Sequence, residues 1–400
     1  MSKLRRAAPG TVPILRRAVE LETLAEAAAI VEEVRLGGES ALRQHAERLG
    51  DLEPGGEILF DRSRLEAALA SPTIEERGVL ERVAGRIRSF AQAQRDSLQD
   101  LDIDVTGGRA GHRWIPVSSA GAYAPGGRYP LPSSVLMTVI PARVAEVKAV
   151  WVASPRPTPV TVAAAAVAGA DGLLAVGGAQ AIAALAFGTL TPACDLVVGP
   201  GNRWVTAAKK HLYGEIGIDG LAGPSELVVV ASDGADPELV ALDLSAQAEH
   251  GPDGLLVLAA DTPELLEAVL DRVEGDATVY AVVLDPVAGL ALSEDLAPEH
   301  LELVGTEAEA LADRVRRAGA LYVGNQAATA FGDYVAGSNH VLPTGGAARF
   351  QSALSASTFR RRMARVTFPG DSATKLAPAG AAVARAEGFP VHAESMERRA

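Results

Sequence analysis

A regular alternation of short apolar runs with helical segments constrains the fold of this chain more than any other feature. The runs are rich in β-branched residues, and the segments between them, such as 159–168 and 180–187, are rich in Ala and Leu. Short apolar runs separated by helical segments predict βαβ units and parallel sheets. There are enough runs for two sheets, divided near residues 222–224, so a duplicated Rossmann-like pair is possible, although no internal repeat is evident. The predicted strands are 149–153, 173–176, 196–198, 227–230, 255–258, 279–284 and 321–323.

The two ends of the chain have a different pattern. Residues before about 105 have helical periodicity, broken at Gly37-Gly38, and the segment after Phe350 contains an arginine triplet and one more helical run. We treat the triplet, Arg360 to Arg362, as a solvated face. We therefore expect an α/β protein with two Rossmann-like parallel-sheet domains. The expected divisions are an N-terminal mainly helical region (1–107), a first Rossmann-like domain (108–225), a second one (226–345) and a C-terminal helical tail (346–400).

Composition excludes several classes of protein. A length of 400 residues is more than one ordinary core supports, so at least two domains are expected. The net charge of −13 has no compensating basic block, which argues against nucleic acid as a partner. The most apolar stretch, 172–190, contains Gly177-Gly178 and Gln180, and is better explained as strand, turn and helix than as a membrane span. The first ten residues have no apolar core, and the single cysteine, Cys194, suits a reducing cytoplasm.

One predicted helix ends in a pair of possible ligands. Asp236 is a suitable N-cap, Pro237 suits the first helical position, and Gly251 is a natural stop. Gln247 and His250, three residues apart in the last turn, would share one face. Such a pair can hold a metal or a polar ligand; alternatively Gln247 is solvated and His250 caps the last carbonyls. The expected buried stripe of this helix consists of Leu239, Val240, Leu242 and Leu244.

Glycine-rich turns follow several predicted strands, at 121–130, 176–181 and 198–204. Backbone amides in such turns can approach a phosphate closely. None of the three matches the GxGxxG dinucleotide pattern, so they signal a cofactor weakly, and tight turns without a ligand remain the alternative.

A carboxylate and an imidazole stand side by side after Pro298, at Glu299 and His300. They are a plausible acid–base pair because histidine exchanges a proton near neutral pH, although surface Glu-His dipeptides are more common. Further candidates lie in Gly-, Pro- or acid-rich contexts at Asp333, His340, Glu387 and His392.

Together, and in their order along the chain, these motifs resemble those of the histidinol dehydrogenase family. The matching stretches are GAYAPGGRYPLPSSVLM, VGGAQAIAALAFGT, VGPGNRWVTAAK, AGPSE, QAEHGPD, PEHLEL, GDYVAGSNHVLPT and the ending from Glu387 to His392. The resemblance extends from about residue 20 to the C-terminus and is strongest over 110–345. It implies oxidation of L-histidinol to L-histidine in two NAD-dependent steps. It also implies zinc-dependent homodimers with shared active sites, in which the C-terminal tail is swapped across the dimer.

The resemblance also implies roles for individual residues. The zinc ligands would be Gln247, His250, Asp333 and His392, the last supplied by the other subunit, with one zinc per subunit. Glu299 and His300 would be the catalytic pair. Two imidazoles, a carboxylate and an amide oxygen suit zinc and leave room for substrate atoms. Substrate contacts would be Ser225, His340 and Glu387, together with His300 and the four zinc ligands. Positions touching NAD, on the first Rossmann-like domain, would be Tyr123, Gln180 and Asn202.

Three departures from the family pattern are visible. The stretch from His250 to Glu299 is shorter than expected, so the second sheet could lack a helix or hairpin. Residues 90–94 lack a histidine, and Ala124 replaces a larger residue near the expected NAD site. GGRYP at 126–130 also resembles relatives that oxidise other polar alcohols, such as sulfonated diols, which is the alternative function. A non-catalytic metal- or nucleotide-binding protein is a third hypothesis, but it would not need the Glu299-His300 pair.

Overall fold

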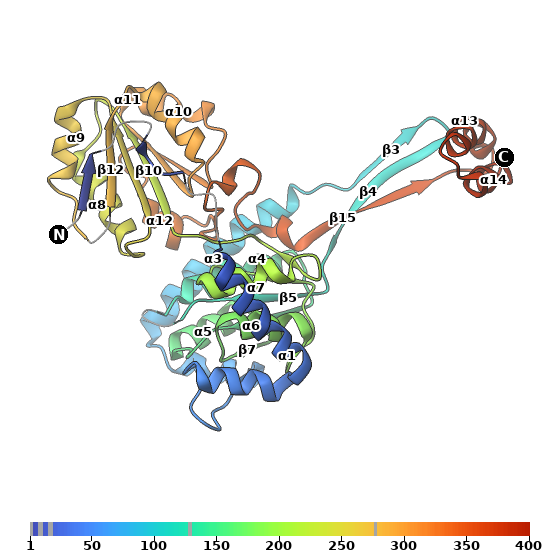
Figure 1. Ribbon diagram of the computed structural model, residues 1–400, viewed down its shortest axis with the longest axis horizontal. Helices are drawn as coiled ribbons and strands as arrows, with labels where there is room; N and C mark the ends of the chain where they lie inside the picture. Colours follow the sequence, from blue (N-terminus) through green and yellow to red (C-terminus); the bar gives the residue numbers. More distant parts are fainter. Residues whose placement is uncertain (1–2, 7–10, 15–18, 127–129, 276–277) are drawn as a thin grey trace.

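The computed structural model describes residues 3–6, 11–14, 19–126, 130–275 and 278–400. Two α/β domains, each built around a six-stranded sheet, lie against each other, and a long arm extends away from them (Figure 1). Within the described residues, no helix has the length and apolar character needed to cross a membrane.

The first sheet has the strand order β2-β7-β6-β5-β8-β9. All of its pairs are parallel except β2 with β7. Its strands are β2 (Leu59–Asp61), β5 (Ser119–Tyr123), β6 (Ala149–Ala153), β7 (Gly172–Leu174), β8 (Leu196–Val198) and β9 (Gly217–Ile218). The helices that connect them are α4 (Pro132–Val144), α5 (Pro159–Ala168), α6 (Gly178–Phe187) and α7 (Arg203–Leu212).

The second sheet has the order β1-β12-β11-β10-β13-β14 and is parallel throughout. Its strands are β1 (Lys3–Arg6), β10 (Glu226–Ala231), β11 (Leu255–Ala260), β12 (Thr278–Val283), β13 (His300–Val304) and β14 (Ala320–Val323). Its helices are α8 (Pro237–Ala248), α9 (Pro263–Leu270), α10 (Pro286–Leu296), α11 (Thr306–Glu309) and α12 (Thr329–Tyr334). A helix follows each strand from β10 to β12, so the short stretch between His250 and Glu299 has not removed one from the alternation.

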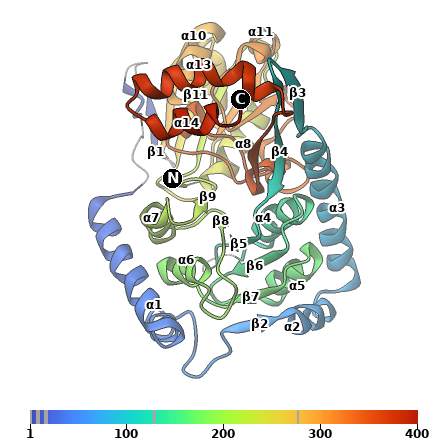
Figure 2. The ribbon, with the colours of Figure 1, turned by 90° about the vertical axis from the view of Figure 1, so that its right-hand side faces the viewer.

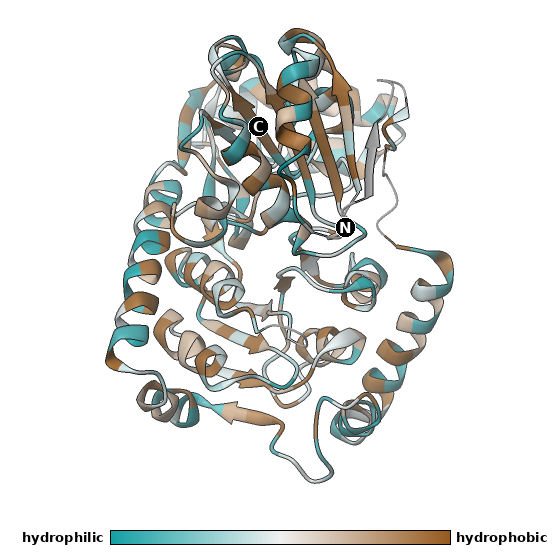
Figure 3. Ribbon diagram, turned by 90° about the vertical axis from the view of Figure 1, so that its left-hand side faces the viewer, coloured by the Kyte–Doolittle hydropathy of each residue, from teal (hydrophilic) through white to brown (hydrophobic). Residues whose placement is uncertain are grey.

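The two sheets repeat one topology. In chain order, β5 to β9 and β10 to β14 both take the arrangement third-second-first-fourth-fifth, and the N-terminal region adds one edge strand to each sheet. The expected α/β class with parallel sheets is therefore confirmed. The strands of the second sheet are apolar on both faces because helices cover both, which explains their continuous Val and Leu runs (Figure 3).

The N-terminal helices cover the first sheet. Helix α1 (Leu21–Arg48) packs on α6 and α7, whereas α3 (Ile74–Asp96) packs on α4 and α5, on the other face; α2 (Arg62–Ala67) lies against α5. The predicted break occurs at Gly38, whose φ of 54° and ψ of −134° are not helical. The three N-terminal helices thus complete the first domain, and the N-terminal region contributes an edge strand to each six-stranded sheet.

The arm is a three-stranded antiparallel sheet of order β15-β4-β3, made of β3 (Leu101–Val105), β4 (Gly108–Pro116) and β15 (Arg360–Thr367). Helices α13 (Ser372–Ala386) and α14 (Pro390–Glu397) pack together at its far end (Figures 1 and 2). The C-terminal segment is therefore not wholly helical, and the expected division at 107/108 falls in the β3–β4 turn. Strand β15 is almost entirely exposed and rich in arginine, so it has no apolar alternation that would predict a strand.

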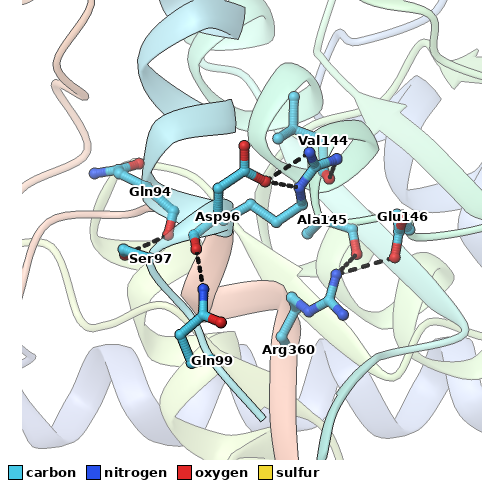
Figure 4. Close-up of polar contacts among 9 residues, drawn as sticks. Gln94, Asp96, Ser97, Gln99, Val144, Ala145, Glu146 and Arg360 are labelled. Carbon is cyan, nitrogen blue, oxygen red and sulfur yellow. Dashed lines mark hydrogen bonds and ion pairs between the residues drawn. The ribbon is translucent and has the colours of Figure 1, made fainter.

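The base of the arm is fixed to the first domain by Arg360 (Figure 4). Its guanidinium donates to the backbone carbonyls of Ala145 (3.3 Å) and Trp114 (3.0 Å), and to a carboxylate oxygen of Glu146 (3.0 Å). The first arginine of the triplet is therefore an anchor, whereas Arg361 and Arg362 are exposed as expected.

Candidate active site

A cavity of about 1080 Å³ lies between the two domains. The first domain contributes turns that follow β5 and β8, at residues 125–126 and 199–201. The second domain contributes the end of α8, the start of β13 and the segment 340–344. The linker 219–225 forms part of the wall between them. The cavity therefore joins carboxyl ends of strands in the first sheet to amino ends of strands in the second.

The predicted catalytic pair lies on this wall, at the amino end of β13. Glu299 is 8% and His300 2% exposed. A carboxylate oxygen of Glu299 accepts hydrogen bonds from the Ser225 hydroxyl (2.5 Å) and from the backbone N–H of Glu226 (3.0 Å). The Gln247 amide in turn donates to the Ser225 hydroxyl. Ser225, Gln247, Glu299 and His300 are therefore brought together by the pairing of β10 with β13 and by the end of α8.

The His300 ring is held on one side and free on the other. Its Nδ1 lies 3.1 Å from the backbone oxygen of Glu226 and 3.6 Å from Oε2 of Glu299. Its buried Nε2 lies 3.8 Å from Oδ1 of Asp333 and has no hydrogen-bond partner among the described residues. Burial acts to lower the pKa of His300, but the negative charges of Glu299 and Asp333 outweigh it, so the pKa is raised. Such an imidazole can accept and hold a proton.

Asp333, on α12, and His340, both half-buried, form the neighbouring wall. Burial acts to raise the pKa of Asp333, but the nearby imidazoles of His300, His340 and His250 favour its ionised form and lower it overall. The Nδ1 of His340 is 2.9 Å from the Asp333 backbone oxygen, and its Nε2 is 3.2 Å from the Ser134 hydroxyl. Burial lowers the pKa of His340. The predicted residues Asp333 and His340 thus line the same cavity as His300.

Helix α8 follows the predicted pattern except at its end. The Asp236 side chain caps the N-terminus, and Pro237 is the first helical residue, both as expected. The helix ends at Ala248, so Gln247 lies in its last turn but His250 lies in the turn that follows. The prediction that Leu242 is buried is wrong, because it is exposed, whereas Val240 and Leu244 are buried as expected. The face of α8 that packs on the second sheet is therefore narrower than the predicted stripe, which included Leu242.

The donor set at this end of the second sheet suits a metal ion. Because the amide nitrogen of Gln247 donates to Ser225, its carbonyl oxygen is left as a donor atom, in addition to the imidazole of His250 and the carboxylate of Asp333. Oxygen and imidazole nitrogen donors are ligands that zinc accepts. Within the described part of the chain, no group of three or more His, Cys, Asp or Glu is placed to hold a metal. Of the four predicted ligands, His250 and Asp333 line the cavity, and the buried Gln247 lies next to it through its bond to Ser225.

The fourth predicted ligand, His392, lies elsewhere. It is on α14 at the end of the arm, where its ring contacts Phe389 with centroids 5.3 Å apart. Glu387 caps the C-terminus of α13 beside it. Both side chains are exposed. The structure therefore does not bring Glu387 and His392 to the other predicted site residues of the same chain (Figure 1).

The predicted NAD positions surround the tight turn between β7 and α6 and the start of α7. The Tyr123 hydroxyl accepts from the Gly178 backbone N–H (3.3 Å). The Gln180 amide donates to Asp51 (3.1 Å), and its buried Oε1 has no partner among the described residues. Asn202 caps α7 by accepting from the backbone N–H groups of two following residues. Residues 127–129 of the GGRYP segment lie outside the described residues.

Three residues with a structural role at the site were not singled out from the sequence. Glu226 contacts both predicted catalytic residues, Ser134 contacts His340, and Asp51 holds Gln180 and the backbone of Gly177. Glu226 has a usable signal, since a carboxylate at the start of an apolar strand needs a partner. Asp51 has none, because it precedes its partners by more than a hundred residues.

A two-domain α/β fold with a carboxylate–imidazole pair in the cavity between its sheets defines the class as an enzyme with acid–base chemistry. A family model described as histidinol dehydrogenase matches residues 16–400. The chain is 44% identical to the histidinol dehydrogenase of Haloarcula marismortui over 92% of each chain, and 40% identical to that of Cereibacter sphaeroides over 93% of this chain and 91% of the relative. The crystal structure of histidinol dehydrogenase from Elizabethkingia anophelis superposes with a TM-score of 0.89 at 29% identity, over 100% of this chain and 97% of that one. The chain belongs to the histidinol dehydrogenase family, whose members are NAD-dependent oxidoreductases.

Proposed function

We propose that the protein oxidises L-histidinol to L-histidine, through histidinaldehyde and with two molecules of NAD, as the last step of histidine biosynthesis. The observation that carries this proposal is the arrangement of Ser225, Glu299 and His300 on the wall of the interdomain cavity. There, a carboxylate is held by two donors beside an imidazole whose Nε2 is free. The two oxidation steps need different proton acceptors, and the two side chains supply them.

In the first step, the Nε2 of His300 takes the hydroxyl proton of histidinol as the carbinol carbon gives up a hydride to NAD. Nδ1 is occupied by the Glu226 carbonyl, so Nε2 is the atom available for that proton. The neighbouring carboxylates of Glu299 and Asp333 stabilise the imidazolium that forms, consistent with the raised pKa of His300. The product of this step is the aldehyde.

In the second step, Glu299 activates a water molecule that attacks the aldehyde. The resulting hydrate loses a second hydride to a second NAD and becomes the carboxylate of histidine. The Ser225 hydroxyl and the backbone of Glu226 orient the Glu299 carboxylate for this role. A cavity enclosed by both domains keeps the reactive aldehyde in place between the steps.

Zinc would be held by Gln247, His250 and Asp333 of this chain and by the partner's His392. The bound ion would polarise and orient the substrate as a Lewis acid. Ser225, His340 and Glu387 would complete the contacts to histidinol. The oxygen and imidazole donors of this chain are of the kind that zinc takes.

NAD would bind at the carboxyl ends of the first sheet, near Tyr123, Gln180 and Asn202. The unpartnered Oε1 of Gln180 supports this location, because a buried acceptor gains a hydrogen bond when a ligand donor reaches it. Parallel sheets of this topology bind ligands at the carboxyl ends beside the strand where the order reverses, which here is β5.

The active enzyme would be a homodimer with shared sites. Glu387 and His392 are exposed at the end of an arm that extends away from its own cavity, and the arm itself presents apolar side chains to solvent. These include Ile103, Val366 and Phe368. Large exposed apolar surfaces on a projecting element indicate an interface. Cytoplasmic location, expected from the single cysteine, stays a prediction.

The test is direct. The zinc-loaded protein should form two molecules of NADH for each L-histidinol consumed, with L-histidine as the product. NADH formation from a sulfonated diol but not from L-histidinol would contradict the proposal. A metal-bound protein that forms NADH from neither alcohol would favour a non-catalytic binding role.

A further inference from the structure

Glu226 lies directly behind both catalytic residues. It is the first residue of β10, is 2% exposed and is not part of the cavity wall. One carboxylate oxygen accepts the backbone N–H of Gly345 (3.0 Å), and the other accepts the backbone N–H of Glu299 (3.2 Å). Each contact reaches a segment distant in sequence, so the side chain links the start of β10 to the start of β13 and to the segment that follows Thr344.

The contact with Glu299 is reciprocal. The Glu226 side chain holds the Glu299 backbone, and the Glu226 backbone N–H donates to the Glu299 side chain at 3.0 Å. Two residues that each bond the backbone of the other with a carboxylate restrain both position and rotation, as the paired bonds of a capping box do at a helix start. This restraint lies where the ladder between β10 and β13 ends, since their register begins at Leu227 and His300.

The backbone carbonyl of Glu226 also selects one tautomer of His300. A carbonyl can only accept, so the 3.1 Å contact requires a proton on Nδ1. In the neutral ring, Nε2 is then the unprotonated atom, and it is the one without a hydrogen-bond partner among the described residues. The nitrogen that must take the alcohol proton is thereby left with its lone pair free.

We infer that Glu226 is a positioning residue that orients Glu299 and His300 together, and through Gly345 holds the segment after His340 against them. This inference rests on the proposed function. A positioning role predicts that both half-reactions slow when Glu226 is replaced while the fold stays stable. A residue that only stabilises the fold would not show this combination. A displacement of about 1 Å at such a site can cost about 100-fold in rate.

The Glu226→Gln variant tests this at constant volume. In Gln an NH2 group replaces one of the two acceptor oxygens, so one of the two backbone N–H groups faces a donor instead of an acceptor. The matched control is Glu309→Gln, because Glu309 accepts the backbone N–H of Gly305 (3.0 Å) just past the carboxyl end of β13, the strand that begins at His300. Zinc-loaded dimers of both variants are assayed with L-histidinol and, separately, with L-histidinaldehyde. For Glu226→Gln we expect kcat to fall about 100-fold with both substrates, with KM, zinc content and Tm close to those of the control.

Two outcomes would overturn the inference: kcat of Glu226→Gln equal to that of the control, or a loss of activity fully accounted for by the unfolded fraction. If this variant does not fold, Glu226→Asp replaces it, because it keeps two acceptors at a shorter reach, and an unchanged kcat would again refute the positioning role. A second readout needs no turnover. Imidazole 15N shifts of His300, assigned with a His300→Asn sample, should report the Nδ1–H tautomer in the wild type and a changed state in Glu226→Gln. Identical shifts would refute the inference even if histidinol proved not to be the substrate.

Discussion

The two sheets have the same strand order but use opposite ends. In the first sheet, the cavity and the predicted NAD positions follow the carboxyl ends of β5, β7 and β8. In the second, the polar cluster of Ser225, Glu226, Glu299 and His300 lies at the amino ends of β10 and β13. Topology alone therefore does not decide which end of a doubly wound sheet takes a ligand.

The carboxyl ends of the second sheet are closed by their own side chains. The Ser232 hydroxyl accepts the Ala308 N–H (3.0 Å), and Asn325 bonds the backbone at Gly234 and Asp236. These bonds satisfy the loop backbones at the position where such folds usually bind ligands. At the amino ends, the predicted catalytic residues of the second sheet face the carboxyl ends of the first across one cavity.

The largest effect is expected where the second sheet depends on another subunit. His250→Ala and His392→Ala should each lose zinc and turnover. After the two variants are unfolded and refolded together, activity should return to about a quarter of the wild-type value. Random pairing makes about half of the dimers mixed, and one of the two sites in each mixed dimer is intact. If each chain used its own His392, every site would keep one lesion and the mixture would remain inactive.

His300→Asn should have the next largest effect. Without the imidazole, the alcohol step loses its base, and kcat for histidinol should fall by about 10³-fold. Zinc content should be unchanged because His300 is not a proposed ligand. Metal analysis and NADH formation measured on the same sample separate the two roles, and loss of zinc would show that the assignment is wrong.

Glu299→Gln should affect one half-reaction more than the other. The variant should lose about 100-fold in the oxidation of histidinaldehyde, since it cannot activate water, and much less in the oxidation of histidinol to the aldehyde. Assays started from each substrate separately provide the measurement. An equal loss in both half-reactions would count against the division of labour.

Gln180→Ala tests the opposite end of the comparison, in the first sheet. Removing one hydrogen-bonding side chain should raise KM for NAD by about tenfold, with little change in KM for histidinol. The control is Asn325→Ala, which alters the closed carboxyl end of the second sheet. If KM for NAD rises in the control but not in Gln180→Ala, the cofactor binds at the second sheet and the proposed location is wrong.

The smallest effect concerns a carboxyl pair formed by the buried Glu302 and the half-buried Asp243. Burial raises the pKa of Asp243 to about 6, and burial together with repulsion by Asp243 raises the pKa of Glu302. Because the folded state binds protons more tightly than the unfolded state, this pair costs stability progressively as the pH rises from about 4 through about 6. The free energy of unfolding of Asp243→Asn, relative to that of the wild type, should therefore be larger at pH 7 than at pH 4. Urea unfolding at the two pH values measures this, and parallel changes in both proteins would contradict it.

Much of the fold could be predicted from the sequence. Strands β6 and β8 and helix α5 have the predicted bounds, and the N-cap at Asp236 is where its local sequence placed it. Such features depend on residues only a few positions apart. Strand β13 was missed, although its first residue is the predicted His300, because the motif around it has too few apolar residues to show a buried strand.

The sequence by itself determined that this is an α/β chain and predicted which side chains carry its chemistry, because periodicity, capping and residue type are local properties. Only the tertiary structure decided how those side chains meet. The bond from Ser225 to Glu299 spans 74 positions and the one from Asp51 to Gly177 spans 126, and both exist because strand order brings distant segments together. The arm also depends on tertiary structure. The Arg-rich β15 has no apolar pattern of its own, and it is a strand because β4 supplies its hydrogen-bond partners.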